Sequence, residues 1–196
     1  MLQKSFVRML RLDGEKIYLQ EFAPENLADG RYHAWLRDLD VVRGIYRLEY
    51  LMPIQYSEIE EYANNLMQSE TDCFFAIYAK ATDDFIGTLR IGHIDWRVGR
   101  GDIGILIGDK NYWGRGIATD AVNVACRYAF KELSLRRLTG GTISTNEAMC
   151  RCFERAGFKQ EGRLREHLLV GGVLVDHVLF GLLKDEFIKR DDQGES

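Results

Sequence analysis

Residues 102–129, DIGILIGDKNYWGRGIATDAVNVACRYA, decide the fold that we expect for this chain. The run 103–107 is apolar and rich in β-branched residues, and glycines flank it, which predicts a strand. From residue 117 onward, apolar side chains recur at three- and four-residue spacing, which predicts a long helix with one buried face. The stretch therefore indicates a strand, a short loop, a glycine-rich turn and a helix.

The turn between this strand and this helix has the features of a phosphate-binding loop. Small residues at positions 114, 116 and 118 let the backbone approach a ligand closely. The first amides of a helix lack partners within the helix, and the helix dipole adds positive potential. Such a turn suits a phosphate or pyrophosphate group. The residues that we expect to form it are Trp113, Gly114, Arg115, Gly116, Ile117, Ala118 and Thr119.

Two kinds of phosphate-binding turn fit this description. A dinucleotide-binding turn has the pattern Gly-x-Gly-x-x-Gly at the start of a βαβ unit, but Thr119 stands where the third glycine belongs. A nicotinamide-binding protein is therefore a weak alternative. Residues 113–118 instead resemble the acyl-coenzyme A motif of the GNAT superfamily of N-acetyltransferases, (Gln/Arg)-x-x-Gly-x-(Gly/Ala). Trp113 departs from the usual first residue, but backbone amides would hold the pyrophosphate.

A second segment carries the same resemblance. Residues 146–158, NEAMCRCFERAGF, are similar to the family's segment N-E-A-S-x-x-x-Y-E-K-x-G-F. With the order of elements, the two motifs cover residues 15–183, and we expect one domain over residues 1–196. The aromatic residues before Gly-Arg-Gly favour the branch that resembles ribosomal-protein N-terminal acetyltransferases.

The remaining elements follow from hydrophobic periodicity and turn residues. Two short helices with a break near Gly30 are predicted after Pro24, and a capping box at 57–60 predicts a helix through about residue 69. The segment 136–144 should run parallel to the central strand, because a helix connects the two. The polar composition of the last dozen residues, 185–196, predicts a frayed tail. The other predicted elements are strands at 14–21, 73–79, 85–96, 163–170 and 173–183, and a helix from Asn146 closed by Gly157.

The element order is β-α-α-β-β-β-α-β-α-β-β, and the fold class is a mixed α/β sheet with helices on both faces. This is the order of the GNAT fold, which the resemblance implies. The Gly171-Gly172 pair between two strand-like runs is a strong hairpin signal.

Composition narrows the classes of function. The net charge of -4 and a sequence pI near 5.6 argue against a nucleic-acid partner. The chain has no apolar run long enough to span a membrane and no secretory signal, which favours a cytoplasmic protein. The four cysteines form no Cys-x-x-Cys pair, so we expect reduced thiols and no metal site.

The resemblance implies acetyl-coenzyme A as cosubstrate and a primary amine as acceptor. The cosubstrate would lie where the sheet opens beside the central strand, and a bulge there would free the backbone of Ile105, Leu106 and Ile107 to pair with its pantetheine arm. Asn146 matches a residue whose side chain commonly bonds that arm, but it would also suit a helix N-cap. The acceptor is left open among protein N-termini, amino sugars and other small amines.

Catalysis by such a site needs a neutral amine, so a base is useful. Asp102, which opens the central strand, matches a position that is often acidic in this branch, and a solvated strand-end carboxylate is the alternative interpretation. His93, Glu49, Glu166 and His177 are weaker candidates.

The main departure from the family pattern is at the positions that supply the general acid. Met149 and Phe153 stand where relatives carry Ser and Tyr, and neither side chain donates a strong hydrogen bond. Phe153 then becomes a packing wall against the coenzyme, and Cys150 is a weak nearby donor. This departure keeps open a catalytically degenerate acyl-coenzyme A sensor. Homodimers are common in the family, so the Gly171-Gly172 hairpin is a candidate subunit contact.

Overall fold

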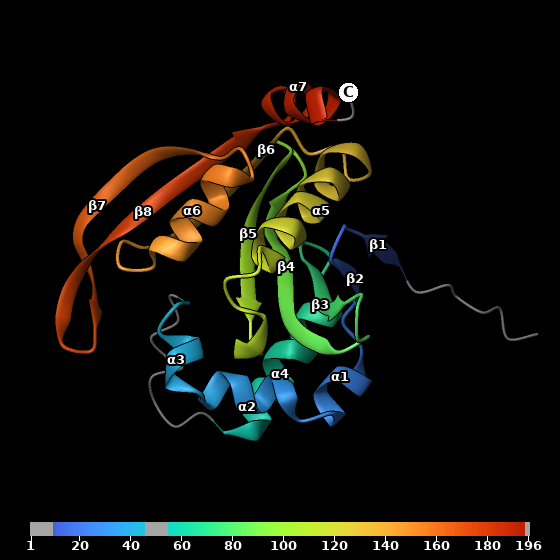
Figure 1. Cartoon of the computed structure of the whole chain (residues 1–196), viewed down its shortest axis with the longest axis vertical. Helices are drawn as coiled ribbons and strands as arrows, with labels where there is room; N and C mark the ends of the chain where they lie inside the picture. Colours follow the sequence, from blue (N-terminus) through green and yellow to red (C-terminus); the bar gives the residue numbers. More distant parts are fainter. Residues whose placement is uncertain (1–9, 46–54, 195–196) are drawn as a thin grey trace, which may run out of the picture.

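A computed structural model of the chain describes residues 10–45 and 55–194. Within these residues, one mixed sheet is flanked by helices (Figure 1). Its strands are β1 (Arg11–Asp13), β2 (Ile17–Glu21), β3 (Cys73–Ala79), β4 (Phe85–Asp95), β5 (Arg100–Ile107), β6 (Arg137–Ile143), β7 (Lys159–Val170) and β8 (Val173–Leu183). The helices are α1 (Pro24–Ala28), α2 (Arg31–Arg37), α3 (Leu39–Val42), α4 (Tyr56–Met67), α5 (Ile117–Lys131), α6 (Glu147–Arg155) and α7 (Lys184–Gly194), with a 3-10 turn η2 (Lys110–Tyr112).

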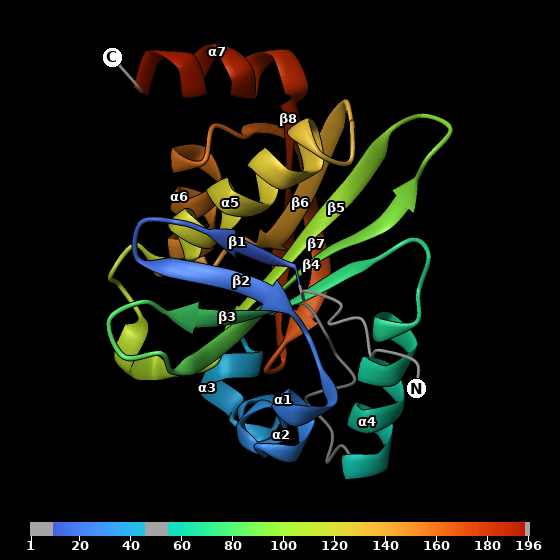
Figure 2. The same ribbon diagram turned by 90° about the vertical axis from the view of Figure 1, so that its right-hand side faces the viewer.

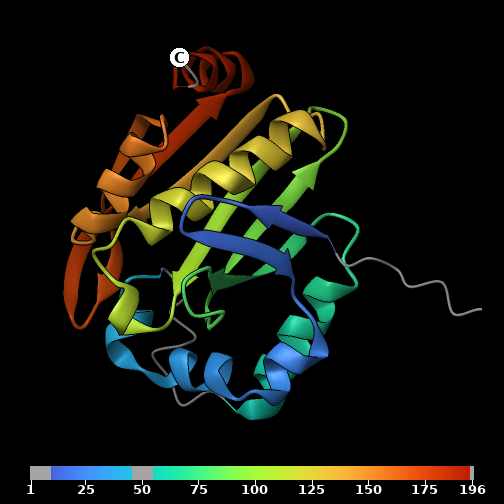
Figure 3. The ribbon, with the colours of Figure 1, turned by 45° about the vertical axis from the view of Figure 1, so that its right-hand side comes forward.

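The strand order is β1-β2-β3-β4-β5-β6-β8-β7, and β5–β6 is the parallel pair among these neighbours. This confirms the parallel crossover through α5, which lies across the sheet in Figure 3. The other neighbouring strands are antiparallel, including the predicted β7–β8 hairpin. Its turn residues, Gly171 and Gly172, both have positive φ angles, which glycine adopts at little cost.

The sheet splits between its two parallel strands. β5 and β6 pair from Arg100 opposite Arg137 to Ile103 opposite Gly140. Beyond that point β5 continues along β4 to Ile107, and β6 continues along β8. The opening predicted beside the central strand is therefore present. It begins directly after Ile103, the residue that follows Asp102.

Two apolar cores cover the two faces of the sheet. The first packs α5 and α6 against inward residues of β2–β6, and the buried side chains of Ile103 and Val124 belong to it. The second packs α1–α4 against the opposite face and includes Phe74 and Leu106. Figure 2 shows α1–α4 gathered together, apart from α5 and α6. Because side chains alternate along a strand, Asp102 shares the face of Leu106, the face of α1–α4.

Several predicted boundaries were wrong for local reasons. The region after Pro24 forms three short helices, although the break at Gly30 is confirmed by its φ of 78°. Helix α4 begins at Tyr56 and not at the predicted Ser57 box, because Glu58 accepts a 2.7 Å hydrogen bond from the backbone N–H of Gln55. Strand β1 was missed because it is only three residues long.

The frayed tail is the clearest error, because residues 184–194 form α7. Phe187 is buried to 1% exposure, and its ring lies 5.4 Å from that of Phe130 on α5. A single aromatic side chain thus anchors an otherwise polar helix to α5. The prediction of a frayed tail relied on the average polarity of the segment and overlooked this residue.

Candidate active site

The glycine-rich turn has the backbone that its sequence predicts. Gly114 and Gly116 have φ angles of 72° and 76°, and a side chain carbon added at Gly114 would meet nothing within 4 Å. Gly116 is the N-cap of α5, and no described side chain caps it. The first amides of α5 therefore face an exposed glycine turn, which fits an anion such as a diphosphate.

Trp113 has a structural role in this loop. Its indole Nε1–H donates a 2.8 Å hydrogen bond to the carbonyl of Ile107 and ties the loop to the end of β5. This contact gives a physical reason for an aromatic residue at the first motif position. Arg115 is exposed and does not line the cleft described below; its guanidinium lies 5.8 Å from the centre of the Tyr112 ring.

A cleft of about 1340 Å³ occupies the split in the sheet. It brings the turn and the end of β5 together with β6 and the start of α6, regions far apart in the sequence. The predicted residues that line it are Asp102, Ile105, Leu106, Ile107, Trp113, Gly114, Gly116, Ile117, Ala118, Thr119, Asn146 and Phe153. An elongated ligand with a phosphate end would have room and donors here.

The backbone of β5 is oriented by its pairing with β4. The N–H of Gly108 donates to the carbonyl of Ile86 at 3.0 Å, and antiparallel pairs alternate along the ladder. The backbone groups of Ile105 and Ile107 therefore point toward the cleft, whereas those of Leu106 face β4. The expected bulge in the central strand was wrong, because the register shift lies in β4, between Gly92 and Asp95.

Asp102 lies at the base of the split. Its Oδ1 accepts a 2.9 Å hydrogen bond from the hydroxyl of Thr139 on β6. Burial raises the pKa of the Asp102 carboxyl, and this hydrogen bond and the neighbouring side chains of His93 and Arg90 oppose the shift. Gly104 is the next residue on the same face, and a side chain carbon there would meet nothing within 4 Å. The carboxylate thus borders open space.

The weaker base candidates have different surroundings. His93 lines the cleft, is exposed and has a φ of 50° in the irregular part of β4. His177 also lines the cleft, and burial together with His167 lowers its pKa. Glu166 does not line the cleft and is exposed on β7. Glu49 lies outside the described residues.

Asn146 caps α6. Its Oδ1 accepts a 3.1 Å hydrogen bond from the N–H of Met149, which confirms the capping interpretation. Its Nδ2 donates to the carbonyl of Gly44 at 2.9 Å. The side-chain amide lines the cleft with both of its polar atoms already bonded, so a ligand would have to share or replace the Gly44 contact.

Phe153 is a core residue that also lines the cleft. It is 1% exposed, and its ring stacks on Phe180 with centroids 5.2 Å apart. A side chain carbon at Gly140 would lie 2.4 Å from its Cζ, so the ring covers β6 where β5 leaves it. Cys150 does not line the cleft; Cys152 does, and burial raises the pKa of its thiol.

Some site residues were missed by the sequence reasoning. Thr139 binds Asp102, and Gly140 leaves room for Phe153; the run Thr-Gly-Gly-Thr at 139–142 was the available signal. Tyr62 on α4 also lines the cleft and was not assigned to it from the sequence, whereas Tyr32 on α2 lies in the aromatic-rich segment after Pro24.

Within residues 10–45 and 55–194, no three His, Cys, Asp or Glu side chains gather as a metal ion would need. No helix in this part of the chain is both long and apolar enough to cross a membrane.

Comparisons with known proteins place this geometry in a family. A family model described as "Acetyltransferase (GNAT) domain" matches residues 16–159. The uncharacterized N-acetyltransferase p20 of Bacillus licheniformis is 36% identical over 58% of this chain and 63% of its own length. The probable N-acetyltransferase YjcK of Bacillus subtilis is 33% identical over 70% of this chain and 75% of its own length. The putative ribosomal N-acetyltransferase YdaF of the same organism is 36% identical over 52% of this chain and 55% of its own.

A solved structure supports the fold independently. The spermidine N-acetyltransferase of Vibrio cholerae, in complex with CoA and spermine, aligns with a TM-score of 0.78. It covers 88% of this chain and 98% of its own at 20% sequence identity, so it bears on the fold alone. The split sheet, the glycine turn and the family match agree: this chain belongs to the GNAT family of N-acetyltransferases.

Proposed function

We propose that this protein transfers the acetyl group of acetyl-coenzyme A to a primary amine, with Asp102 as the base. The observation that carries the proposal is the position of Asp102, one residue before β5 and β6 separate and on the border of the cleft. The open glycine turn at one end of the same cleft supports a phosphorylated cosubstrate.

The cosubstrate would supply a thioester, whose carbonyl carbon is the electrophile. The amides at the start of α5 would hold its diphosphate. The backbone of Ile105 and the N–H of Ile107 would pair with its pantetheine arm, since both point toward the cleft. These contacts orient the thioester near the split. Trp113 keeps the turn fixed to β5 through its bond to Ile107.

The acceptor would enter from the face of α1–α4. Asp102 and the empty space at Gly104 lie on that face, and Tyr32 and Tyr62 line it. An amine with a pKa near 10 is mostly protonated at neutral pH, so a base must take its proton, directly or through water. The raised pKa of Asp102 makes it a stronger base than an ordinary carboxylate.

The acceptor in this reaction would be a primary amine. Among proteins similar to this chain, one is named a putative ribosomal N-acetyltransferase and another a spermidine N-acetyltransferase. These names suggest two arms for a screen: peptides with a free N-terminus, and polyamines.

The test is release of free coenzyme A, measured with a thiol reagent, from acetyl-coenzyme A and each arm of the amine library. We expect turnover with at least one amine and none with the matching acetylated amine. Coenzyme binding by calorimetry without turnover on any amine would contradict the transferase proposal, and absence of binding would contradict the cosubstrate assignment.

A further inference from the structure

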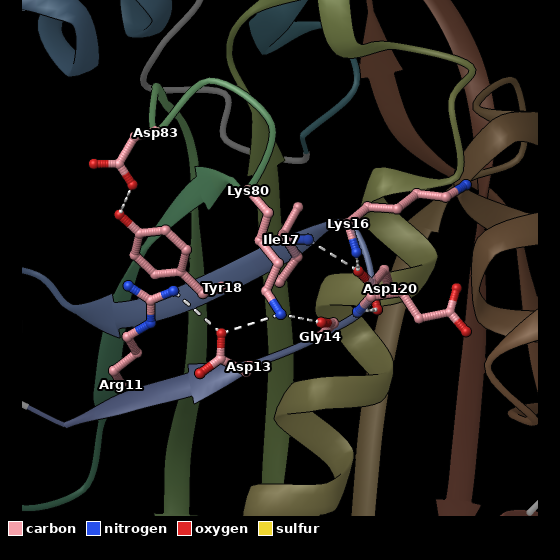
Figure 4. Close-up of polar contacts among 10 residues, drawn as sticks. Arg11, Asp13, Gly14, Lys16, Ile17, Tyr18, Lys80, Asp83 and Asp120 are labelled. Carbon is pink, nitrogen blue, oxygen red and sulfur yellow. Dashed lines mark hydrogen bonds and ion pairs between the residues drawn. The ribbon is translucent and has the colours of Figure 1, made fainter.

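The turn between β1 and β2 is fastened to the first turn of α5. The carboxylate of Asp120 accepts hydrogen bonds from three successive backbone N–H groups, those of Glu15 at 3.1 Å, Lys16 at 2.7 Å and Ile17 at 3.1 Å (Figure 4). Gly14 fits tightly against this carboxylate, since a side chain carbon there would lie 2.7 Å from Asp120 Oδ1. Three amides that converge on one carboxylate fix the backbone of residues 15–17 relative to α5.

This arrangement places the side chain of Lys16 at the glycine-rich turn. Its Nζ donates a 2.9 Å hydrogen bond to the carbonyl of Arg115, which lies between Gly114 and Gly116. A side chain carbon added at Gly116 would lie 3.3 Å from the same Nζ. The ammonium group therefore adjoins the N-cap of α5, and only one of its three N–H groups is needed for the Arg115 carbonyl.

The β1–β2 turn, which carries Lys16, is also held by Lys80 at the end of β3. Lys80 donates to the carbonyl of Gly14 at 2.6 Å and pairs with Asp13 at 3.1 Å (Figure 4). The backbone N–H of Lys80 also donates to the carbonyl of Lys16 at 2.9 Å. These bonds hold the hairpin turn against β3, so Lys16 projects from a backbone that is fixed on two sides.

We propose that Lys16 binds the diphosphate of the cosubstrate and that Asp120 is the residue that positions it, an inference that rests on the proposed function. An ammonium beside open helix amides adds a full charge to the partial charge of the helix end, and a diphosphate needs both. The Asp120 carboxylate is occupied by three backbone amides, so it orders the loop that carries Lys16. The turn thus gains a cation from a segment about 100 residues away in the sequence.

Calorimetric titration with coenzyme A and with 3′-dephospho-coenzyme A tests this assignment in the whole chain. The variants are Lys16→Gln, Lys16→Arg, Asp120→Asn and the double variant, and the melting temperature of each is measured without ligand. Lys159→Gln is the matched control, because Lys159 is an exposed lysine at the start of β7 whose ion-pair partner is Glu186 on α7.

We expect Lys16→Gln to weaken the binding of both ligands about tenfold, because Lys16 is exposed and solvent screens its charge. The loss should shrink at high salt, and Lys16→Arg should retain most of the affinity. Asp120→Asn should weaken binding too, but less in the Lys16→Gln background, since the two residues act together. Lys159→Gln should bind as the parent does.

Four results would overturn the inference. If Lys16→Gln binds both ligands like the parent, Lys16 only holds the Arg115 carbonyl. If the loss disappears with the dephospho ligand, Lys16 contacts the 3′-phosphate and not the diphosphate. Additive effects of Lys16→Gln and Asp120→Asn would show that Asp120 does not act through Lys16. A parent that binds neither ligand would remove the proposed function itself and this inference with it.

Discussion

The two walls of the cleft are built on different principles. The wall formed by β5 and the turn at 113–119 presents backbone groups, set by glycines with positive φ angles and by a helix end. The wall formed by β6 and α6 presents side chains, and these are already engaged. Asn146 caps its helix and binds Gly44, and Phe153 is packed into the core.

This difference explains which wall can be interpreted from sequence. A binding site made of backbone requires particular backbone angles, and only glycine adopts those angles without strain, so its pattern is visible in the sequence. A site made of side chains depends on which of those side chains already pack in the core. On the α6 wall, a match between a residue and a family position is therefore weaker evidence that the side chain is free to contact a ligand.

The largest expected effect is on the backbone wall, from Gly116→Val. A β-branched residue at φ 76° is strained, and its side chain would approach Nζ of Lys16 at about the 3.3 Å found for an added carbon. We expect acetyl-coenzyme A to bind about a hundredfold more weakly and to lose its stabilising shift in melting temperature.

Gly171→Val is the matched control for this prediction. Gly171 also has a positive φ, 57°, but lies in the exposed β7–β8 turn. It should show the same kind of backbone strain while keeping the ligand-induced shift. An unchanged shift in folded Gly116→Val would mean that the turn does not bind the diphosphate.

The next effect concerns Asp102, the proposed base, which lies where the two walls of the cleft meet. We expect Asp102→Asn to lower turnover about a hundredfold with little change in coenzyme affinity. The loss should shrink at alkaline pH, because more of the amine is then already neutral. Steady-state rates across pH, with Asp95→Asn as a control at the other end of the β4–β5 turn, check this. A parent-like pH profile in Asp102→Asn would place the base elsewhere.

The sequence predicted the central part of the fold and most of the cleft. Strand β3 was predicted to the residue, and the parallel β5–β6 pair followed from the connecting helix. The misses were elements stabilised mainly by tertiary contacts, such as α7 with its single buried Phe187. Leu106 was assigned to the site from the bulge expected in the central strand, but its backbone faces β4. Arg115 was assigned from the motif, but its side chain lies outside the cleft lining.

Phe153→Tyr tests the side-chain wall. The ring lines the cleft and its Cζ lies over Gly140, the last β6 residue paired with β5, so an added hydroxyl would emerge near the split. If the site lacks an acid there, we expect turnover to rise several-fold, with a slightly lower melting temperature from burying a hydroxyl.

Phe158→Tyr provides the control for that change. Phe158 is also buried, its ring lies 5.1 Å from that of Phe153, and it does not line the cleft. It should lose stability without any gain in rate. A folded Phe153→Tyr protein with lower turnover would show that the site requires an apolar wall, and the proton donor should then be sought among the residues of β5 or the acceptor side.

The smallest effect is on stability, and it separates Asp102 from structural carboxylates. Burial raises the pKa of Asp102 in the folded state, so the folded state binds its proton more tightly than the unfolded state does. Stability from this group is therefore present below the ordinary carboxyl pKa and is lost as pH rises through the higher, folded value. Asparagine carries no charge and its oxygen can still accept from Thr139.

We therefore expect Asp102→Asn to melt at a slightly higher temperature than the parent at neutral pH, with the difference vanishing in acid. Asp95→Asn should not show this gain, because Arg97 lowers the pKa of Asp95 and the sign is reversed. Thermal melts of the three proteins across the carboxyl titration range make the comparison. A loss of stability in Asp102→Asn at neutral pH would mean that the ionised carboxylate holds β5 to β6. The carboxylate would then have a structural role. A gain in stability in Asp102→Asn would instead indicate that the carboxylate destabilises the fold and is retained for another role, as a catalytic base would be.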